Sequence, residues 1–166
     1  MEITDFSPAI TLGDAGHRTE EHALEVQLPF LQEVLQDFKL LPIIMGDQDT
    51  QIIEVLAAAL EHVLKNKKAL VVASTDLSHF HSYDRATILD RIVVDDINTF
   101  NEKKLLDDIQ RNRCEMCGGG PAVAVMKTAR LLGANQSKVL IYRNSGDVSG
   151  DKGQVVGYLS SVLYKS

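Results

Sequence analysis

Apolar residues recur at helical spacing over much of the chain. Segment 50–64 places isoleucines and leucines three and four positions apart among alanines, which predicts an amphipathic helix. The same spacing predicts helices over 83–100 and 121–132, the second closed by Gly133 as a C-terminal cap, and a shorter, more polar helix over 102–111. These four helices dominate the part of the chain after residue 50.

Another helix is predicted near the N-terminus. Thr19 and the two acidic residues after it suit a helix start, because a hydroxyl can cap free amides and acids favour the positive end of the dipole. Leu24, Leu28 and Leu31 then lie on one side. Pro29 falls inside this pattern, where its missing N–H is predicted to kink or divide the helix.

Four apolar segments are predicted to be strands. Segment 40–45 is a short buried strand, and 69–73 is apolar on both faces, as in the middle of a sheet covered by helices on both sides. Two more strands are predicted over 138–143 and 154–163, around a Ser-Gly-Asp loop. The alternation of strands and helices predicts an α/β layered sandwich with a central mixed or mostly parallel sheet flanked by helices. Four strands make a thin sheet for so many helices.

Composition indicates an ordinary single domain over 1–166. The chain is 45% hydrophobic and 24% charged, with a net charge of −6. Its longest basic stretch, 65–68, is too short to follow nucleic-acid phosphates, so neither nucleic acid nor a membrane is an expected partner. The sequence has no long apolar run and no secretion signal, and its two cysteines lie too close in sequence to suggest a disulfide framework. The expected location is cytoplasmic.

The polar segment 74–81 directly follows the predicted strand 69–73. Ligands in α/β sheets collect at the carboxyl ends of strands. Asp76 and His79 are three positions apart, so they can face one cavity, where a carboxylate fixes the imidazole tautomer and raises its basicity. His81 points elsewhere if this segment is helical. The alternative is that Ser74 or Asp76 only caps a helix and that both histidines are surface residues.

Cys117 is the second candidate for chemistry. It precedes three glycines at the start of a predicted helix, where free amides and the helix dipole stabilise a thiolate, as suits a metal ligand or nucleophile. Alternatively, the glycines only allow a tight turn and Cys117 packs as a small hydrophobe. Cys114 completes a single C-x-x-C, but the chain has no second pair for a zinc site. His22, on the first turn of the N-terminal helix, is either a pocket residue or a surface residue.

Four motifs in series resemble the C-terminal portion of the Memo-like family. They are EEHALEVQLPF at 20–30, STDLSH at 74–79, CGGGP at 117–121 and SGDVSGD at 145–151. The bacterial and archaeal members of this family are the B component of the AmmeMemoRadiSam system. The resemblance implies the α/β sandwich of the class III extradiol ring-cleaving dioxygenases, which use non-haem iron.

The resemblance also assigns roles to individual residues. Cys117 corresponds to the metal-binding cysteine of the family, and His79 is expected to serve as a metal ligand and, with Asp76, as a catalytic residue. His22 and Gly118 are expected to line the same pocket. Sulfur and imidazole donors of this kind suit iron(II) or copper.

One departure from the family pattern is large. Family members begin with a segment that carries a Pro-His-Ala-Gly-Tyr strand end and a second Ser-His site, whose two histidines complete the metal centre. Neither motif occurs in this sequence. The chain is therefore expected to be an N-terminally truncated Memo-like domain with an incomplete metal site. Exposed sheet edges are expected as well, and a second copy of the chain is one candidate to cover them.

Three functions follow from these observations. The first is a partial metal or small-molecule site formed by the pocket residues. The second is a non-enzymatic binding protein whose partner is a radical SAM protein or an AMMECR-like protein. The third is an extradiol-type dioxygenase in which iron(II) binds a catechol and O₂, although those enzymes use two histidines and a carboxylate, so the cysteine argues against it.

Overall fold

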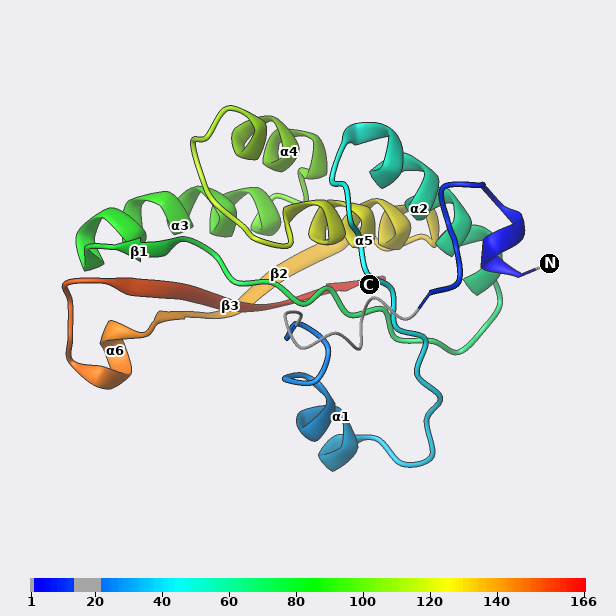
Figure 1. The fold of residues 1–166 in the computed structure, drawn as a ribbon, viewed down its shortest axis with the longest axis horizontal. Helices are drawn as coiled ribbons and strands as arrows, with labels where there is room; N and C mark the ends of the chain where they lie inside the picture. Colours follow the sequence, from blue (N-terminus) through cyan, green and yellow to red (C-terminus); the bar gives the residue numbers. More distant parts are fainter. Residues whose placement is uncertain (1, 14–21) are drawn as a thin grey trace.

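A layer of helices lies over a small sheet in the computed structural model, which describes residues 2–13 and 22–166 (Figure 1). The elements are η1 (Ile3–Asp5), α1 (Leu28–Val34), α2 (Thr50–Leu64), β1 (His79–His81), α3 (Tyr83–Asn98), α4 (Glu102–Gln110), α5 (Gly119–Leu131), β2 (Gln136–Asn144), α6 (Gly146–Ser149) and β3 (Val155–Tyr164). None of the described helices combines the length and apolar character needed to cross a bilayer.

The four helices predicted after residue 50 are confirmed, with ends that differ by at most two residues. Two of them have side-chain caps: the Asp49 carboxylate accepts from the N–H of Ile52 at the start of α2, and the Asn101 side chain accepts from the N–H of Lys104 in α4. Gly133, with a φ of 96°, follows the end of α5 in the left-handed conformation that favours glycine.

The core lies where these helices meet above the sheet. Ile53 of α2, Val93 of α3, Leu105 of α4 and Val123 of α5 are fully buried in one cluster. Leu77 joins them from the segment that leads into β1. The apolar stripe of each helix therefore faces its neighbours, as its spacing predicts.

The sheet is antiparallel, with strand order β1-β3-β2. Pairs such as Lys138 with Val162 and Asn144 with Gly157 align β2 against β3, and β1 pairs with the start of β3. The predicted mixed or mostly parallel sheet is therefore wrong. The loop that joins β2 to β3 holds only the short helix α6, and a connection this short returns the chain antiparallel to itself.

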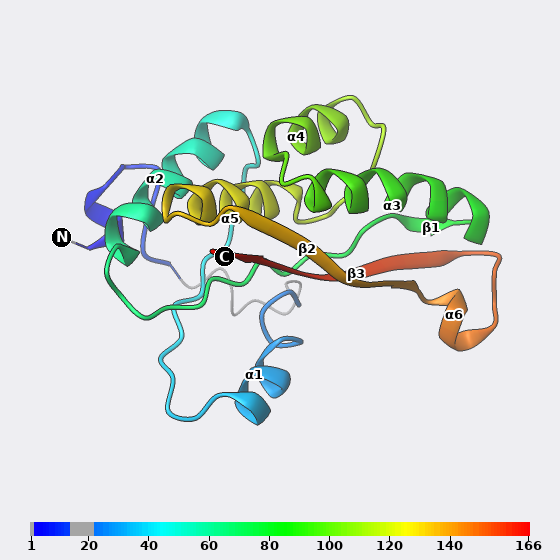
Figure 2. The same ribbon diagram turned by 180° about the vertical axis from the view of Figure 1, so that it is seen from behind.

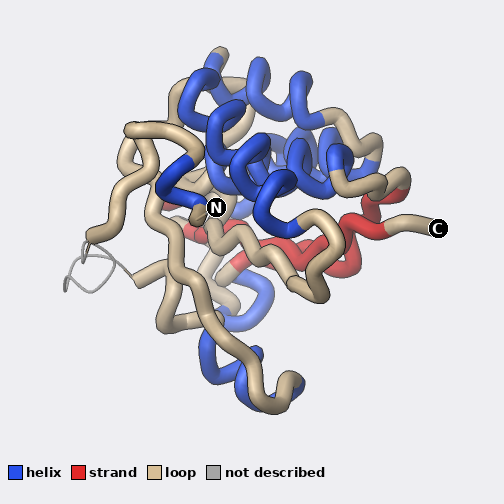
Figure 3. Tube along the Cα trace, turned by 90° about the vertical axis from the view of Figure 1, so that its right-hand side faces the viewer, coloured by secondary structure: helices blue, strands red, loops and turns tan. Residues whose placement is uncertain are grey.

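Helices α2 to α5 all lie on one side of the sheet (Figures 2 and 3). On the other side the described residues place α1, which buries none of its residues. The protein is thus α/β, but in the described part of the chain only one face of the sheet is covered by helices that bury residues against the core. The likeness to the extradiol dioxygenase fold stays a prediction.

Two predicted strands and one predicted helix differ from the structure. Segments 40–45 and 69–73 pair with no strand among the described residues, and most of their apolar side chains are exposed. An apolar run indicates that a segment would suit a sheet. The segment forms a β-strand only where another strand pairs with it through backbone hydrogen bonds. The predicted start at Thr19 lies outside the described residues. The helix begins at Leu28, with Pro29 in the first turn, where a missing N–H breaks no bond, so the prediction that Pro29 kinks or divides the helix is wrong.

Candidate functional site

The segment that carries Asp76 and His79 is held between β3 and α3. The N–H of Leu77 donates to the Gly157 carbonyl at 2.9 Å, and the Gly157 N–H donates to the Ser78 carbonyl at 3.0 Å. On the other side, the Ser78 N–H donates to Oδ1 of Asp90 at 3.0 Å. These three bonds fix Leu77 and Ser78, the two residues between Asp76 and His79.

Asp90 is a fully buried carboxylate that the sequence interpretation missed. Its Oδ2 accepts a 2.8 Å hydrogen bond from the hydroxyl of Tyr142. Burial and this bond to an anion together raise the pKa of Tyr142 to about 12. The signal was present in the sequence, because Asp90 occupies the apolar stripe of α3, four residues after Ala86 and three before Val93.

Cys117 lies against the same segment. The N–H of Asp76 donates to Sγ of Cys117 at 3.2 Å, and the Thr75 hydroxyl lies 3.5 Å from that sulfur. In return, the Cys117 N–H donates to the Asp76 carbonyl at 3.3 Å, and the Gly118 N–H donates to the Thr75 hydroxyl at 2.8 Å. The turn that begins α5 is thereby fastened to residues 75–76, while the cysteine remains exposed.

Gly118 and Gln48 shape this turn. A Cβ at Gly118 would lie 2.8 Å from the Ser74 carbonyl oxygen, so only glycine fits without a shift. The side chain of Gln48 donates to the Cys117 carbonyl at 2.8 Å and accepts from the Gly120 N–H at 2.6 Å. No pattern in the sequence connects Gln48 to a glycine 72 residues later, so this contact could not be predicted.

His79 and Asp76 lie together, as their spacing predicts. Nε2 of His79 is 3.4 Å from Oδ2 of Asp76, and both side chains are partly exposed. His81 lies in strand β1 rather than in a helix, and its Nε2 lies 2.9 and 3.0 Å from the two carboxylate oxygens of Glu115. Glu115 is two residues before Cys117, so this pair ties β1 to the loop that carries the thiol.

His22 does not join this group in the described contacts. Its Nδ1 lies 2.6 Å from Oε1 of Glu25, and its side chain is largely exposed. It precedes α1 and lies outside any helix, which corrects its predicted place on a first helical turn. Its role as a pocket residue stays a prediction.

The donor set at Cys117 is small. Within residues 2–13 and 22–166, no three histidine, cysteine, aspartate or glutamate side chains come together as a metal-binding group. The structure therefore offers an exposed thiol against the backbone of Asp76, whose carboxylate pairs with His79, and this is fewer donors than a closed metal site uses. Iron(II) or copper binding stays a prediction.

The two cysteines should differ sharply in reactivity. Cys114 is buried, and burial raises the pKa of its thiol to about 12, whereas Cys117 is exposed. We expect a thiol reagent at pH 8 to modify one cysteine per folded chain and two in denaturant, read out by mass spectrometry. Cys117→Ser should abolish modification of the folded chain. Equal rates for both thiols in the folded protein would contradict this assignment.

Taken together, these contacts define an α/β protein with an exposed cysteine at a glycine-rich turn, fastened to the segment that enters the first strand. The model of the family described as Memo-like protein matches residues 2–162. The chain belongs to this family.

Curated relatives support the same assignment. MEMO1 family proteins of Methanobrevibacter smithii and Methanosarcina mazei are 40% and 39% identical to this chain, each over 98% of it. A MEMO1 family protein of Methanocaldococcus jannaschii is 38% identical over 93% of the chain. The alignments cover 57%, 62% and 55% of these relatives, respectively, so the chain spans little more than half of their length.

Proposed function

We propose that this Memo-like chain carries a ligand-binding site centred on the thiol of Cys117. The ligand is a metal ion that accepts sulfur and imidazole donors, iron(II) or copper, or a small molecule that reacts with or coordinates sulfur. The observation that carries the proposal is the fixed geometry of an exposed sulfur, with the Asp76 N–H at 3.2 Å and the Thr75 hydroxyl at 3.5 Å. A cysteine that only filled space would be buried, as Cys114 is.

His79 and Asp76 are the candidates proposed to assist the thiol. The Asp76 N–H itself donates to Cys117, and hydrogen bonds to β3 and α3 hold the two residues that separate Asp76 from His79. Imidazole and thiolate donors together suit iron(II) and copper better than magnesium or calcium. Because the described residues supply fewer donors than a closed site needs, we expect them to bind an ion weakly, and tight binding requires donors from outside them.

Calorimetric titration under reducing, anaerobic conditions tests this proposal. We expect iron(II) or copper(I) to bind at one site per chain, and Cys117→Ala to weaken binding of the ion at least tenfold, because the central donor is removed. His79→Ala should weaken it by a smaller factor. The matched controls are Cys114→Ala, which removes the buried thiol, and His62→Ala, which removes a histidine of α2.

Two outcomes would overturn the proposal. Stoichiometric binding that survives Cys117→Ala and His79→Ala together would place the ion elsewhere. Absence of binding to the wild-type chain by either ion, combined with a Cys117 thiol no more reactive than that of Cys114, would remove both the metal and the small-molecule versions. Association with a radical SAM or AMMECR-like protein and extradiol dioxygenase activity stay predictions from the family resemblance, since no contact in the described residues favours either.

A further inference from the structure

A groove separates segment 69–73 from the second half of β3. At one end of the groove, two hydrogen bonds join residues 77–78 to Gly157 and hold the two segments together. Upstream of Leu77 the two segments separate, and a cavity of about 610 Å³ lies between them. Its walls are residues 69–73 and 159–165, and its floor is the face of α5 that carries Ala122, Val125, Met126 and Ala129, together with Leu132 just after the helix.

Both walls are extended segments whose edges toward the groove are unpaired among the described residues, although β3 pairs with β2 along its other edge. Within the described residues, segment 69–73 forms no backbone hydrogen bond, and β1 pairs with β3 only at its start, at Val155 and Val156. The rest of that edge of β3, from Tyr158 onward, faces the groove unpaired. Five extended residues span about 17 Å, so the groove is bounded on each side by the length of an ordinary short strand.

The side chains of the groove are those of a sheet interior. Val71 and Ala73 are turned inward, and Ala73 packs on the core, whereas Leu70 is 67% exposed and Val72 is also exposed. Val162 is exposed in the same way on the facing strand. An apolar strand edge that is open to water is a site where another strand can add. Its unpaired backbone N–H and C=O groups can form hydrogen bonds with that strand, and its apolar pockets can bind the side chains.

We propose that this groove receives an extended β-strand from the part of a Memo-family protein that this chain does not match, whether joined to this chain or separate from it. The relatives named above carry that additional part, which makes up 38% to 45% of their length (100 − 62 and 100 − 55). The inserted strand pairs with β3 on one side and with segment 69–73 on the other. The sheet then becomes continuous across the groove.

The groove also reaches the Cys117 site. Thr75, whose hydroxyl lies 3.5 Å from the Cys117 sulfur, lines the cavity, as do Gln27 and Met116. An inserted strand would end beside this segment and cover the open side of the turn. The inference goes beyond the proposed function, because it concerns assembly of the sheet and holds whether or not the thiol binds a metal.

Co-expression tests the inference. The chain is produced with a tagged polypeptide that comprises the unmatched part of the Methanobrevibacter smithii relative, and the tagged polypeptide is purified in the absence of added metal. We expect a soluble complex with one copy of each, and hydrogen exchange at least tenfold slower at residues 69–73 and 158–164 in the complex than in the chain alone. Amides on the outer edge of β2 should not change.

A matched pair of variants locates the contact. Leu70→Asp should lower the affinity of the complex at least tenfold, because it places a charge in the groove wall. Leu131→Asp is the control: this leucine of α5 is 59% exposed and does not line the cavity. Because both side chains are exposed in the isolated chain, neither variant should prevent folding.

Each remaining outcome counts against the proposal. Recovery of the tagged polypeptide without the chain, or only as insoluble material, would overturn it. A dimer of this chain alone that protects residues 69–73 would identify a second copy as the occupant instead. Equal weakening by Leu70→Asp and Leu131→Asp would place the contact outside the groove. Because no metal is added, failure here leaves the thiol proposal untouched, and loss of metal binding leaves this one untouched.

Discussion

Gly157→Ala is expected to lower the free energy of unfolding by about 3 kcal/mol, as the sum of overpacking and a disturbed buried hydrogen bond. A Cβ at this position would overlap Oδ2 of Asp90 and lie 2.7 Å from its Cγ. Asp90 cannot move aside without loss of its bonds to Ser78 and Tyr142. Urea denaturation followed by circular dichroism measures the change.

Gly46→Ala is the control for this substitution. A Cβ at Gly46 would meet no atom within 4 Å, and its backbone is not in the left-handed region. We expect a change within about 0.5 kcal/mol there. If the two variants unfolded at the same urea concentration, the close approach of β3 to Asp90 would not constrain the fold. Asp90 would then not be a rigid anchor for the segment that carries Asp76 and His79.

The helices were predictable because the information that specifies them is local. The apolar spacing of 50–64 and its neighbours repeats within a few turns, and each stripe alone identifies the buried face. Segment 69–73 has equally clear strand composition, yet it pairs with no strand in the described residues. Pairing depends on a partner distant in sequence, so composition could indicate that the segment suits a sheet but not where, or with what, it pairs.

In the candidate site too, the residues with a local signal were predictable and the contacts between distant segments were not. Cys117 at a helix start and Asp76 after a strand-like segment were each identified from local signals, and the structure brings them into contact. The contacts of Gln48 and Glu115 join segments 69 and 34 residues apart and have no periodic signature. Asp90 was missed, although an acid on an apolar stripe is a visible exception to the pattern.

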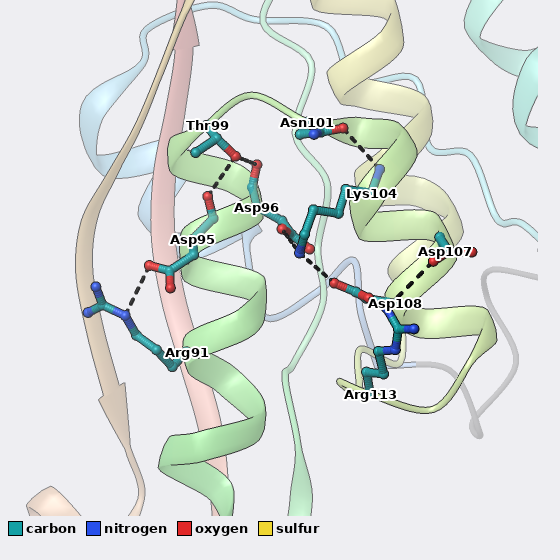
Figure 4. Close-up of polar contacts among 9 residues, drawn as sticks. All are labelled: Arg91, Asp95, Asp96, Thr99, Asn101, Lys104, Asp107, Asp108 and Arg113. Atoms are coloured by element: carbon teal, nitrogen blue, oxygen red, sulfur yellow. Dashed lines mark hydrogen bonds and ion pairs between the residues drawn. The ribbon is translucent and has the colours of Figure 1, made fainter.

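A second cluster of buried acidic residues lies between α3 and α4 (Figure 4). We expect the removal of its lysine to have the other large effect on stability. Asp96 and Asp108 are 2% and 3% exposed, and Nζ of Lys104 lies 2.6 and 2.7 Å from their carboxylates. Arg113 also donates to Asp108, at 2.9 Å. Asp96 has no other cation, and its Oδ2 has no hydrogen-bond partner in the described part of the chain.

These contacts affect the pKa values of the three groups differently. Burial raises the pKa of Asp96 despite its bond to Lys104. Hydrogen bonds from Lys104 and Arg113 outweigh burial at Asp108 and lower its pKa, and the two carboxylates raise the pKa of Lys104. Asp108 therefore contributes stability above its unfolded pKa that is lost as the pH falls through its lowered pKa, and Lys104 contributes stability that is lost as the pH rises through its raised pKa. A raised pKa at Asp96 acts oppositely to Asp108, because the native state then binds the proton more tightly than the unfolded chain does.

Lys104→Met is expected to lower the free energy of unfolding at pH 7 by about 3 kcal/mol, the lower end of the cost of removing one partner from a buried ion pair, because Lys104 is 52% exposed. The loss should shrink as the pH falls toward 5, since Asp96 without its cation takes up a proton more readily in the folded state. Urea denaturation at pH 5, 6 and 7 measures both effects. Lys103→Met, a neighbouring exposed lysine outside the cluster, is the matched control and should change little at any of these pH values.

The double variant Asp96→Asn with Lys104→Met separates charge burial from packing. An amide carries no charge, so it should recover a large part of the stability lost at pH 7 and remove most of the pH dependence. A loss that is the same at pH 5 and pH 7, with no recovery in the double variant, would mean that Lys104 stabilises the helix pair through its aliphatic chain. In that case the pairing between α3 and α4 would depend on packing around Leu105 rather than on neutralisation of Asp96.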